Sequence, residues 1–184
     1  MFFFFKNKDV IFEPQSVEHA YLLLLEEELN NSKKIFNTID SPRARWGRIL
    51  IDILSGYIED YPTYFEIRNF LEIDLDFLLK NEKINYVEQL LGSLDLLVSI
   101  NQETYKFVAR VMFENRLYKA CREYLEKSKS IYYNDPELHF MFAKYYIKTR
   151  EYDIADFHLD ECLSFLPDYY PAKILQKEIS RYLA

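Results

Sequence analysis

A repeat of 34 residues runs through the carboxyl-terminal half of this 184-residue sequence and constrains its fold more than any other feature. Sliding the sequence by 34 positions brings residues of the same kind together: Ala109 falls on Ala143, and Leu125 falls on Leu159. The other matched pairs are Tyr105 with His139, Val108 with Phe142, Met112 with Tyr146, Tyr118 with Tyr152, Cys121 with Ala155, and Ser128 with Cys162. A period of this length predicts units that stack on one another, because a single unit cannot bury its apolar face alone.

A third, weaker copy of the repeat precedes these two. Its apolar residues occupy the same columns: Leu71, Leu75, Leu78, Ile84, Val87, Leu91 and Leu94. Small residues recur in both halves of each later copy, for example Ala109 and Cys121. Their positions predict that two helices approach each other closely, while the large residues fill the groove between successive pairs.

Composition and capping patterns indicate that the fold is all-α. Three glycines and six prolines are too few for the many tight turns of a β-sandwich or barrel, and 49% apolar residues exclude a disordered chain. Capping patterns occur at Ser16, Ser41-Pro42, Thr63 with Glu66, Asn101 and Asp135-Pro136. The predicted helices lie near residues 16–30, 32–40, 42–60, 63–80, 83–99, 102–114, 118–132, 136–148, 152–165 and 170–183.

Charge and apolar runs limit the partners that the chain can have. A net charge of -7 argues against nucleic acid as the main partner, because phosphate binding needs a basic surface. No stretch reaches the roughly 20 apolar residues of a membrane-spanning helix. The segment Met1–Phe5 is predicted to be a hydrophobic arm folded onto the domain; the alternative is a patch for membrane contact or self-association, such as a homodimer. Cys121 and Cys162 are predicted to be reduced packing residues of a cytoplasmic protein.

The period and its small residues resemble the tetratricopeptide repeat (TPR) family. The resemblance covers residues 68–167 and is best in 136–167, where Ala143, Ala155 and Pro167 match the family pattern. Tyr105 and His139 stand in place of the family's first-helix tryptophan, Tyr133 stands in place of its closing proline, and Asp74 occupies an apolar column. The resemblance implies a right-handed α-solenoid built from helical hairpins.

The resemblance also implies three parts in the chain. Residues 1–62 would form divergent helical hairpins with the apolar arm, residues 63–167 about three TPR-like repeats, and residues 168–184 a capping helix that covers the last apolar face.

Members of the family bind partners on a concave surface made by the first helix of each repeat. Carried over column by column, the inward positions are Asn69, Glu72, Asp76, Leu79, Lys80, Glu103, Lys106, Arg110, Phe113, Glu114, Glu137, Phe140, Lys144, Ile147 and Lys148. The predicted peptide-binding groove consists of Lys106, Arg110, Phe113, Phe140, Lys144, Ile147 and Lys148. This groove would be locally basic, with its cations pairing with a carboxylate and its apolar residues burying an apolar side chain. The alternative is that the cations merely solvate the surface.

The residues of a catalytic or metal site are not predicted anywhere in the sequence. The three glycines are isolated, so there is no phosphate-binding loop, and the three histidines are far apart in the sequence. His158 and Cys162 lie one helical turn apart and could share a metal with Asp156 or Glu161, but Cys162 occupies a packing column, which favours core packing. No catalytic residue, metal or cofactor is therefore predicted. The acidic stretch Glu59, Asp60, Glu66, Glu72, Asp74 and Asp76 is predicted to be a solvated face, or else a contact for a basic partner.

Three functions follow from this sequence, in decreasing order of support. The first is a scaffold or adaptor that binds a peptide or partner protein in the concave groove. The second is a small secretion-type chaperone of the same repeat class, which would hold an apolar client segment and dimerise through its amino-terminal helices. The third is an enzyme, for which the sequence offers no set of catalytic residues.

Overall fold

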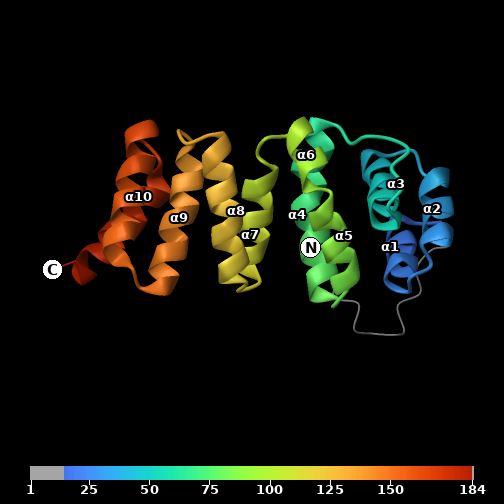
Figure 1. The fold of residues 1–184 in the computed structure, drawn as a ribbon, viewed down its shortest axis with the longest axis horizontal. Coiled ribbons are helices and arrows are strands. Elements are labelled where there is room, and N and C mark those ends of the chain that lie inside the picture. The colour runs from blue at the N-terminus through green and yellow to red at the C-terminus, as the bar shows by residue number, and fades with distance from the viewer. Residues whose placement is uncertain (1–14, 184) are drawn as a thin grey trace.

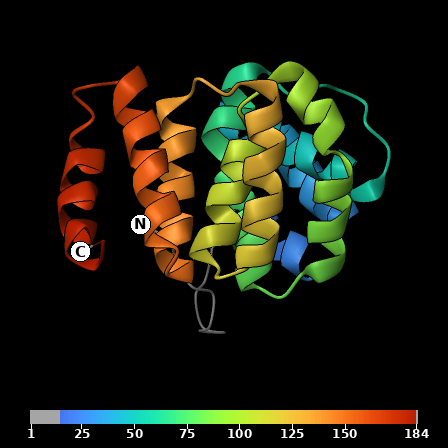
Figure 2. The same ribbon diagram turned by 60° about the vertical axis from the view of Figure 1, so that its left-hand side comes forward.

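The computed structural model describes residues 15–183, and these residues form helices and connections without a β-strand. The Met1–Phe5 arm lies outside the described residues. The helices are α1 (Val17–Leu25), α2 (Leu29–Thr38), α3 (Pro42–Ser55), α4 (Tyr64–Lys80), α5 (Ile84–Gly92), α6 (Leu94–Ile100), α7 (Thr104–Glu114), α8 (Tyr118–Ile131), α9 (Pro136–Thr149), α10 (Tyr152–Phe165) and α11 (Tyr170–Ile179), followed by a 3₁₀ turn (Ser180–Tyr182). They lie side by side along an elongated molecule, from α1–α3 at one end to α10 and α11 at the other (Figures 1 and 2). The all-α prediction is confirmed.

The 34-residue period recurs in the backbone of three turns. Glu82, Arg116 and Arg150 have positive φ angles of 57°, 62° and 65° and end α4, α7 and α9 in the left-handed conformation. The same hydrogen bond closes each turn, between an N–H and the carbonyl five residues earlier: Lys83 to Leu78 (3.0 Å), Leu117 to Met112 (2.8 Å) and Glu151 to Tyr146 (2.9 Å). The repeat detected in the sequence is therefore a repeat of chain direction.

The predicted caps also recur at equivalent places. The side-chain oxygen of Asn101 accepts a hydrogen bond from the N–H of Glu103, and Asp135, 34 residues later, accepts one from Glu137, each at 2.9 Å. The capping box of Thr63 and Glu66 and the Ser16 and Ser41 caps are confirmed. These local interactions fix where the helices begin.

Small residues lie where successive helices meet. Ala109, Cys121, Ala143 and Ala155 are all fully buried, as are Leu125 and Leu159 beside them. The predicted role of the small columns is confirmed, because a larger side chain in any of them would separate α7 from α8 or α9 from α10.

Two predicted helices are shorter than expected. The predicted helix 42–60 ends at Ser55, because Gly56 adopts a left-handed conformation with φ 75°. The predicted helix 83–99 is two helices, α5 and α6, separated at Ser93. The connection after Gly56 returns along α3, since Arg45 near the start of α3 bonds to Asp60 (2.7 Å) and to the carbonyl of Tyr61 (3.1 Å).

Asp74 corrects the prediction that the acidic stretch is a solvated face. Asp74 is fully buried in α4 and accepts hydrogen bonds from Tyr21 of α1 (2.9 Å) and from Trp46 and Arg43 of α3. The Arg43 guanidinium bonds to both carboxylate oxygens and lies 4.5 Å from the centre of the Tyr21 ring. We call these four residues the Asp74 cluster. It joins α1, α3 and α4, which explains a carboxylate in an apolar column.

Candidate functional site

The inward positions predicted from the sequence meet on one surface, which we call the α4–α7–α9 face. Arg110 of α7 lies at its centre. One nitrogen of its guanidinium donates to Glu72 of α4 (2.6 Å), and another donates to Glu137 of α9 (2.9 Å). A single side chain therefore joins three helices that are distant in the sequence.

Lys106 is the most buried charged residue of this face, with a side chain that is 3% exposed. Its ammonium lies 2.6 Å from Asp135, 2.9 Å from Glu103 and 3.0 Å from Glu137. Burial alone would lower the pKa of Lys106, but its hydrogen bonds to Asp135 and Glu103 and their charges raise that pKa well above its ordinary value. The carboxylates that Lys106 pairs with thus belong to this chain, and Lys106 joins α7 to the start of α9.

Lys144 of α9 is half-buried and covers an aromatic ring. Its ammonium lies 4.8 Å from the centre of the Phe113 ring and 3.5 Å from a carboxylate oxygen of Glu114. Phe113 itself is buried and packs edge-on against Tyr118, with ring centres 5.7 Å apart. Phe113 is therefore a part of the core beneath the face.

Three further predicted residues lie closer to solvent. Phe140 is half-buried and contacts Tyr169, which precedes α11, with ring centres 5.2 Å apart. Ile147 is half-buried one helical turn after Lys144, and Lys148 is exposed. Phe140 and Ile147 are thus the apolar side chains of the predicted set that a partner can reach.

The charge of the face differs from the expected basic groove. Lys106, Arg110 and Lys144 all pair with carboxylates of the same surface. The side chains of Glu114 and Glu137 are 62% and 45% exposed, more than the side chain of any of these three cations. Burial and the charge of Glu137 raise the pKa of Glu72, although Arg110 opposes this. The surface offered to a partner is mixed in charge, with carboxylates outermost.

A shallow hollow of about 330 Å³ lies between α4 and α7 on this face. Its lining residues are Glu72, Ile73, Asp76, Lys80, Arg110, Val111 and Glu114. Asp76 bonds to Lys80 (2.6 Å) and to Asn115 (2.8 Å), so its walls are held by contacts within the chain.

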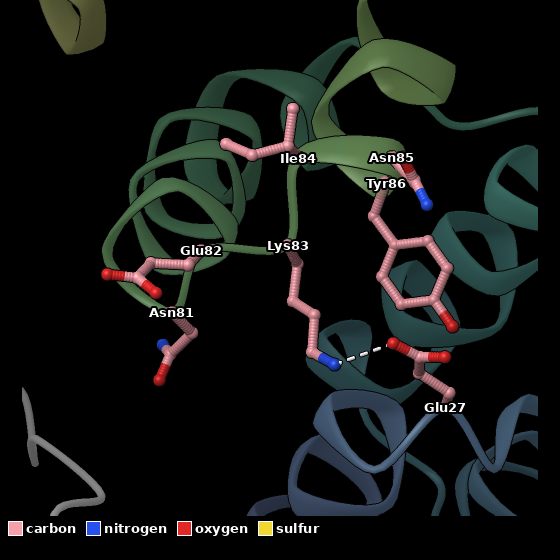
Figure 3. A pocket seen from close by; sticks show the side chains of 7 residues that line it. All are labelled: Glu27, Asn81, Glu82, Lys83, Ile84, Asn85 and Tyr86. Atoms are coloured by element: carbon pink, nitrogen blue, oxygen red, sulfur yellow. Dashed lines mark hydrogen bonds and ion pairs between the residues drawn. The ribbon is translucent and has the colours of Figure 1, made fainter.

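Another pocket, of about 370 Å³, lies where the α1–α2 turn meets the α4–α5 turn. Lys83 and Glu27 reach toward each other from these two turns and form an ion pair at 2.8 Å, with Tyr86 beside them (Figure 3). Burial and the charge of Glu27 raise the pKa of Tyr86. None of the predicted groove residues lines this pocket.

Two of the histidines, expected to be unrelated because they are far apart in the sequence, are in contact. Nδ1 of His139 lies 3.0 Å from Nδ1 of His158, and Nε2 of His139 lies 2.9 Å from the carbonyl oxygen of Tyr133. The repeat contains a signal for this pair: shifting Tyr105 and Tyr124 by 34 residues gives His139 and His158, and the two tyrosines stack with ring centres 6.1 Å apart.

The sulfur atoms of the chain are buried. Cys121 and Cys162 are free and fully buried, and burial raises the pKa of Cys162 to about 11. Across residues 15–183, no three His, Cys, Asp or Glu residues are placed to hold a metal ion. In the same range, no helix combines the length and apolar character needed to cross a membrane.

Comparison with known proteins gives one similar structure and no family assignment. No family model matches the sequence, and no curated protein matches it. A solved structure similar to this chain is the C-terminal part of a TPR repeat-containing protein from Cytophaga hutchinsonii, with 14% sequence identity and a TM-score of 0.47. The match covers 89% of this chain and 70% of that chain. The description of the present chain as a helical-repeat array rests on its own helix pairs and turns.

Proposed function

We propose that this chain is a protein-interaction scaffold whose α4–α7–α9 face binds an extended or helical segment of a partner protein. The observation that carries the proposal is the position of Arg110, which bonds to Glu72 and Glu137 and so holds three helices together before a partner arrives. A surface that is already ordered loses little conformational entropy when it binds.

The residues of the predicted groove then have two different roles. Lys106, Arg110 and Lys144 hold the face in shape through their ion pairs, and Phe113 supports it from below. Phe140, Ile147 and Lys148 make the contacts with the partner, because they are the predicted residues on α9 that reach solvent. The right-handed twist of the array and its division at residues 62 and 167 belong to the same proposal.

Selection of a displayed random-peptide library on the purified chain tests this function. The variants Phe140→Ser and Ile147→Ser, checked for native helix content by circular dichroism, should bind the selected peptides about tenfold more weakly, the effect of losing about 1.4 kcal/mol of contact. Lys119→Glu is the matched control, because Lys119 is exposed on α8, outside the face. Equal affinity of the wild type and both serine variants would reject the proposed face.

A further inference from the structure

A second hollow, larger and more apolar than the one on the α4–α7–α9 face, lies between the start of α3 and the start of α4. Its volume is about 580 Å³. Its lining residues are Asp40, Ser41, Pro42, Arg45, Arg48, Thr63, Phe65, Glu66, Asn69 and Phe70. We call it the α3–α4 hollow. Asn69 is also an inward position of α4, three residues before Glu72, so a bound segment can continue from one hollow to the other along a single helix.

The apolar side of this hollow is open to solvent. Phe65 is 69% exposed, although it is the second residue of α4 and neighbours the buried Glu66. Pro42 is exposed opposite it, and Phe70 is half-buried. Exposed aromatic rings that face a hollow are typical of contact surfaces rather than of a folded interior.

The two arginines of the hollow differ in what they bind. Arg45 is fully engaged, because it pairs with Glu66 and Asp60 and donates to the carbonyl of Tyr61. Arg48 donates one hydrogen bond, to the carbonyl of Phe36 (3.0 Å), and forms no ion pair with a carboxylate of residues 15–183. A half-buried guanidinium with unused N–H groups favours a carboxylate ligand, which it can bind through two parallel hydrogen bonds.

We propose that the α3–α4 hollow binds a polypeptide segment of a partner in which an aromatic or large aliphatic side chain stands beside a carboxylate. The apolar side chain packs against Phe65 and Pro42, and the carboxylate pairs with Arg48. Asp40 lies exposed at the rim and repels the same carboxylate, so it limits the affinity. This inference names the partner chemistry of the interaction scaffold proposed above and rests on that function.

The test uses the whole chain and three short synthetic peptides with blocked ends, in which a Gly/Ser background carries Phe-Asp-Asp, Phe-Asn-Asn or Ser-Asp-Asp. Fluorescence anisotropy measures the dissociation constants. The Phe-Asp-Asp peptide should bind about fivefold or more tightly than the other two, which corresponds to about 1 kcal/mol for each missing contact. Equal affinity for the three peptides would overturn the proposal.

Two substitutions with opposite expected effects make the test specific. Arg48→Gln should remove the preference for the acidic peptide over its amide analogue, whereas Asp40→Asn should strengthen acidic-peptide binding about twofold, because a surface charge interaction is small. Lys119→Gln, on α8, is the neutral control for a lost cation. A preference that persists in Arg48→Gln would contradict the role of Arg48.

The outcomes also separate this subsite from the proposed function. If peptides selected on the chain lose affinity in Ile147→Ser but not in Arg48→Gln, the α4–α7–α9 face binds partners and the α3–α4 hollow does not. If the loss occurs only in Arg48→Gln, the hollow binds acidic segments and the proposed face is wrong.

Discussion

A glycine in the middle of α3 determines how closely two helices approach. Gly47 costs about 1 kcal/mol relative to alanine in a helix interior, so its presence needs a reason. A Cβ atom at this position would lie 2.6 Å from atoms of the Phe36 ring. That ring is fully buried and packs against Tyr21, with ring centres 5.2 Å apart, so it cannot turn aside.

Gly47→Ala should therefore destabilise the protein by about 2 kcal/mol, the usual cost of overpacking a core, even though alanine is the better helix former. Urea denaturation followed by the fluorescence of Trp46, the single tryptophan, measures the loss. Gly92→Ala is the matched control, since a Cβ there would meet nothing within 4 Å. Similar effects of the two substitutions would show that Phe36 can move.

At the scale of an element, the α9–α10 pair contains two neutral histidines in an aromatic stack. His158 lies between the rings of Phe142 and Tyr146, nearly parallel to both, with centres 4.6 and 5.5 Å away. Burial, with the nearby positive charges of His139 and Lys129, lowers the pKa of His158 to about 4. Burial also lowers the pKa of His139. Protonation of either ring would place a charge inside the helix pair.

This arrangement predicts a loss of stability as the pH falls. Between about pH 6.5 and the lowered pKa of His158, the unfolded chain binds a proton that the folded chain does not, so stability is complete above this window and decreases through it. From pH 7 to pH 5 the free energy of unfolding should fall by about 2 kcal/mol on account of His158. Urea denaturation at both pH values measures this, and His158→Phe should reduce the difference. An equal pH dependence in the variant would contradict the prediction.

At the scale of the molecule, buried ion pairs join successive helix pairs. Lys106 of α7 bonds to Asp135, the residue that caps α9, and so connects two repeats at the point where one ends and the next begins. The small apolar columns hold the helices of one pair together, whereas charged residues tie one pair to the next.

Lys106→Met should destabilise the protein by about 3 kcal/mol, because it leaves the carboxylates of Asp135, Glu103 and Glu137 without their cation. Hydrogen exchange should increase in α7 and α9 together, since both lose the same link. Lys144→Met, at a half-exposed ion pair, should cost less than about 1 kcal/mol. An equal cost for the two variants would mean that Lys106 does not connect the repeats.

The sequence predicts those parts of the molecule that depend on neighbours in the chain. The caps at Ser41, Thr63 and Asp135 involve residues two or three positions apart, and all three are confirmed. The contact between Asp74 and Tyr21 joins residues 53 positions apart in different helices, so a repeat pattern cannot reveal it.

The groove residues illustrate the same limit. Arg110 was predicted from its column, and it lies on the expected face, but its partners Glu72 and Glu137 depend on how α4, α7 and α9 are placed. The expected basic surface was wrong for that reason: a column identifies a side chain and not the charge that stands opposite it.

The Asp74 cluster has a consequence for how a chain of this kind can change its length over evolution. Adding or deleting a whole 34-residue segment after α6 leaves Tyr21, Arg43 and Trp46 in place around their carboxylate. The same event between α1 and α4 would separate donor from acceptor and strand a charge in the interior. Lineages descended from this sequence are therefore free to gain or lose units only on one side of α4.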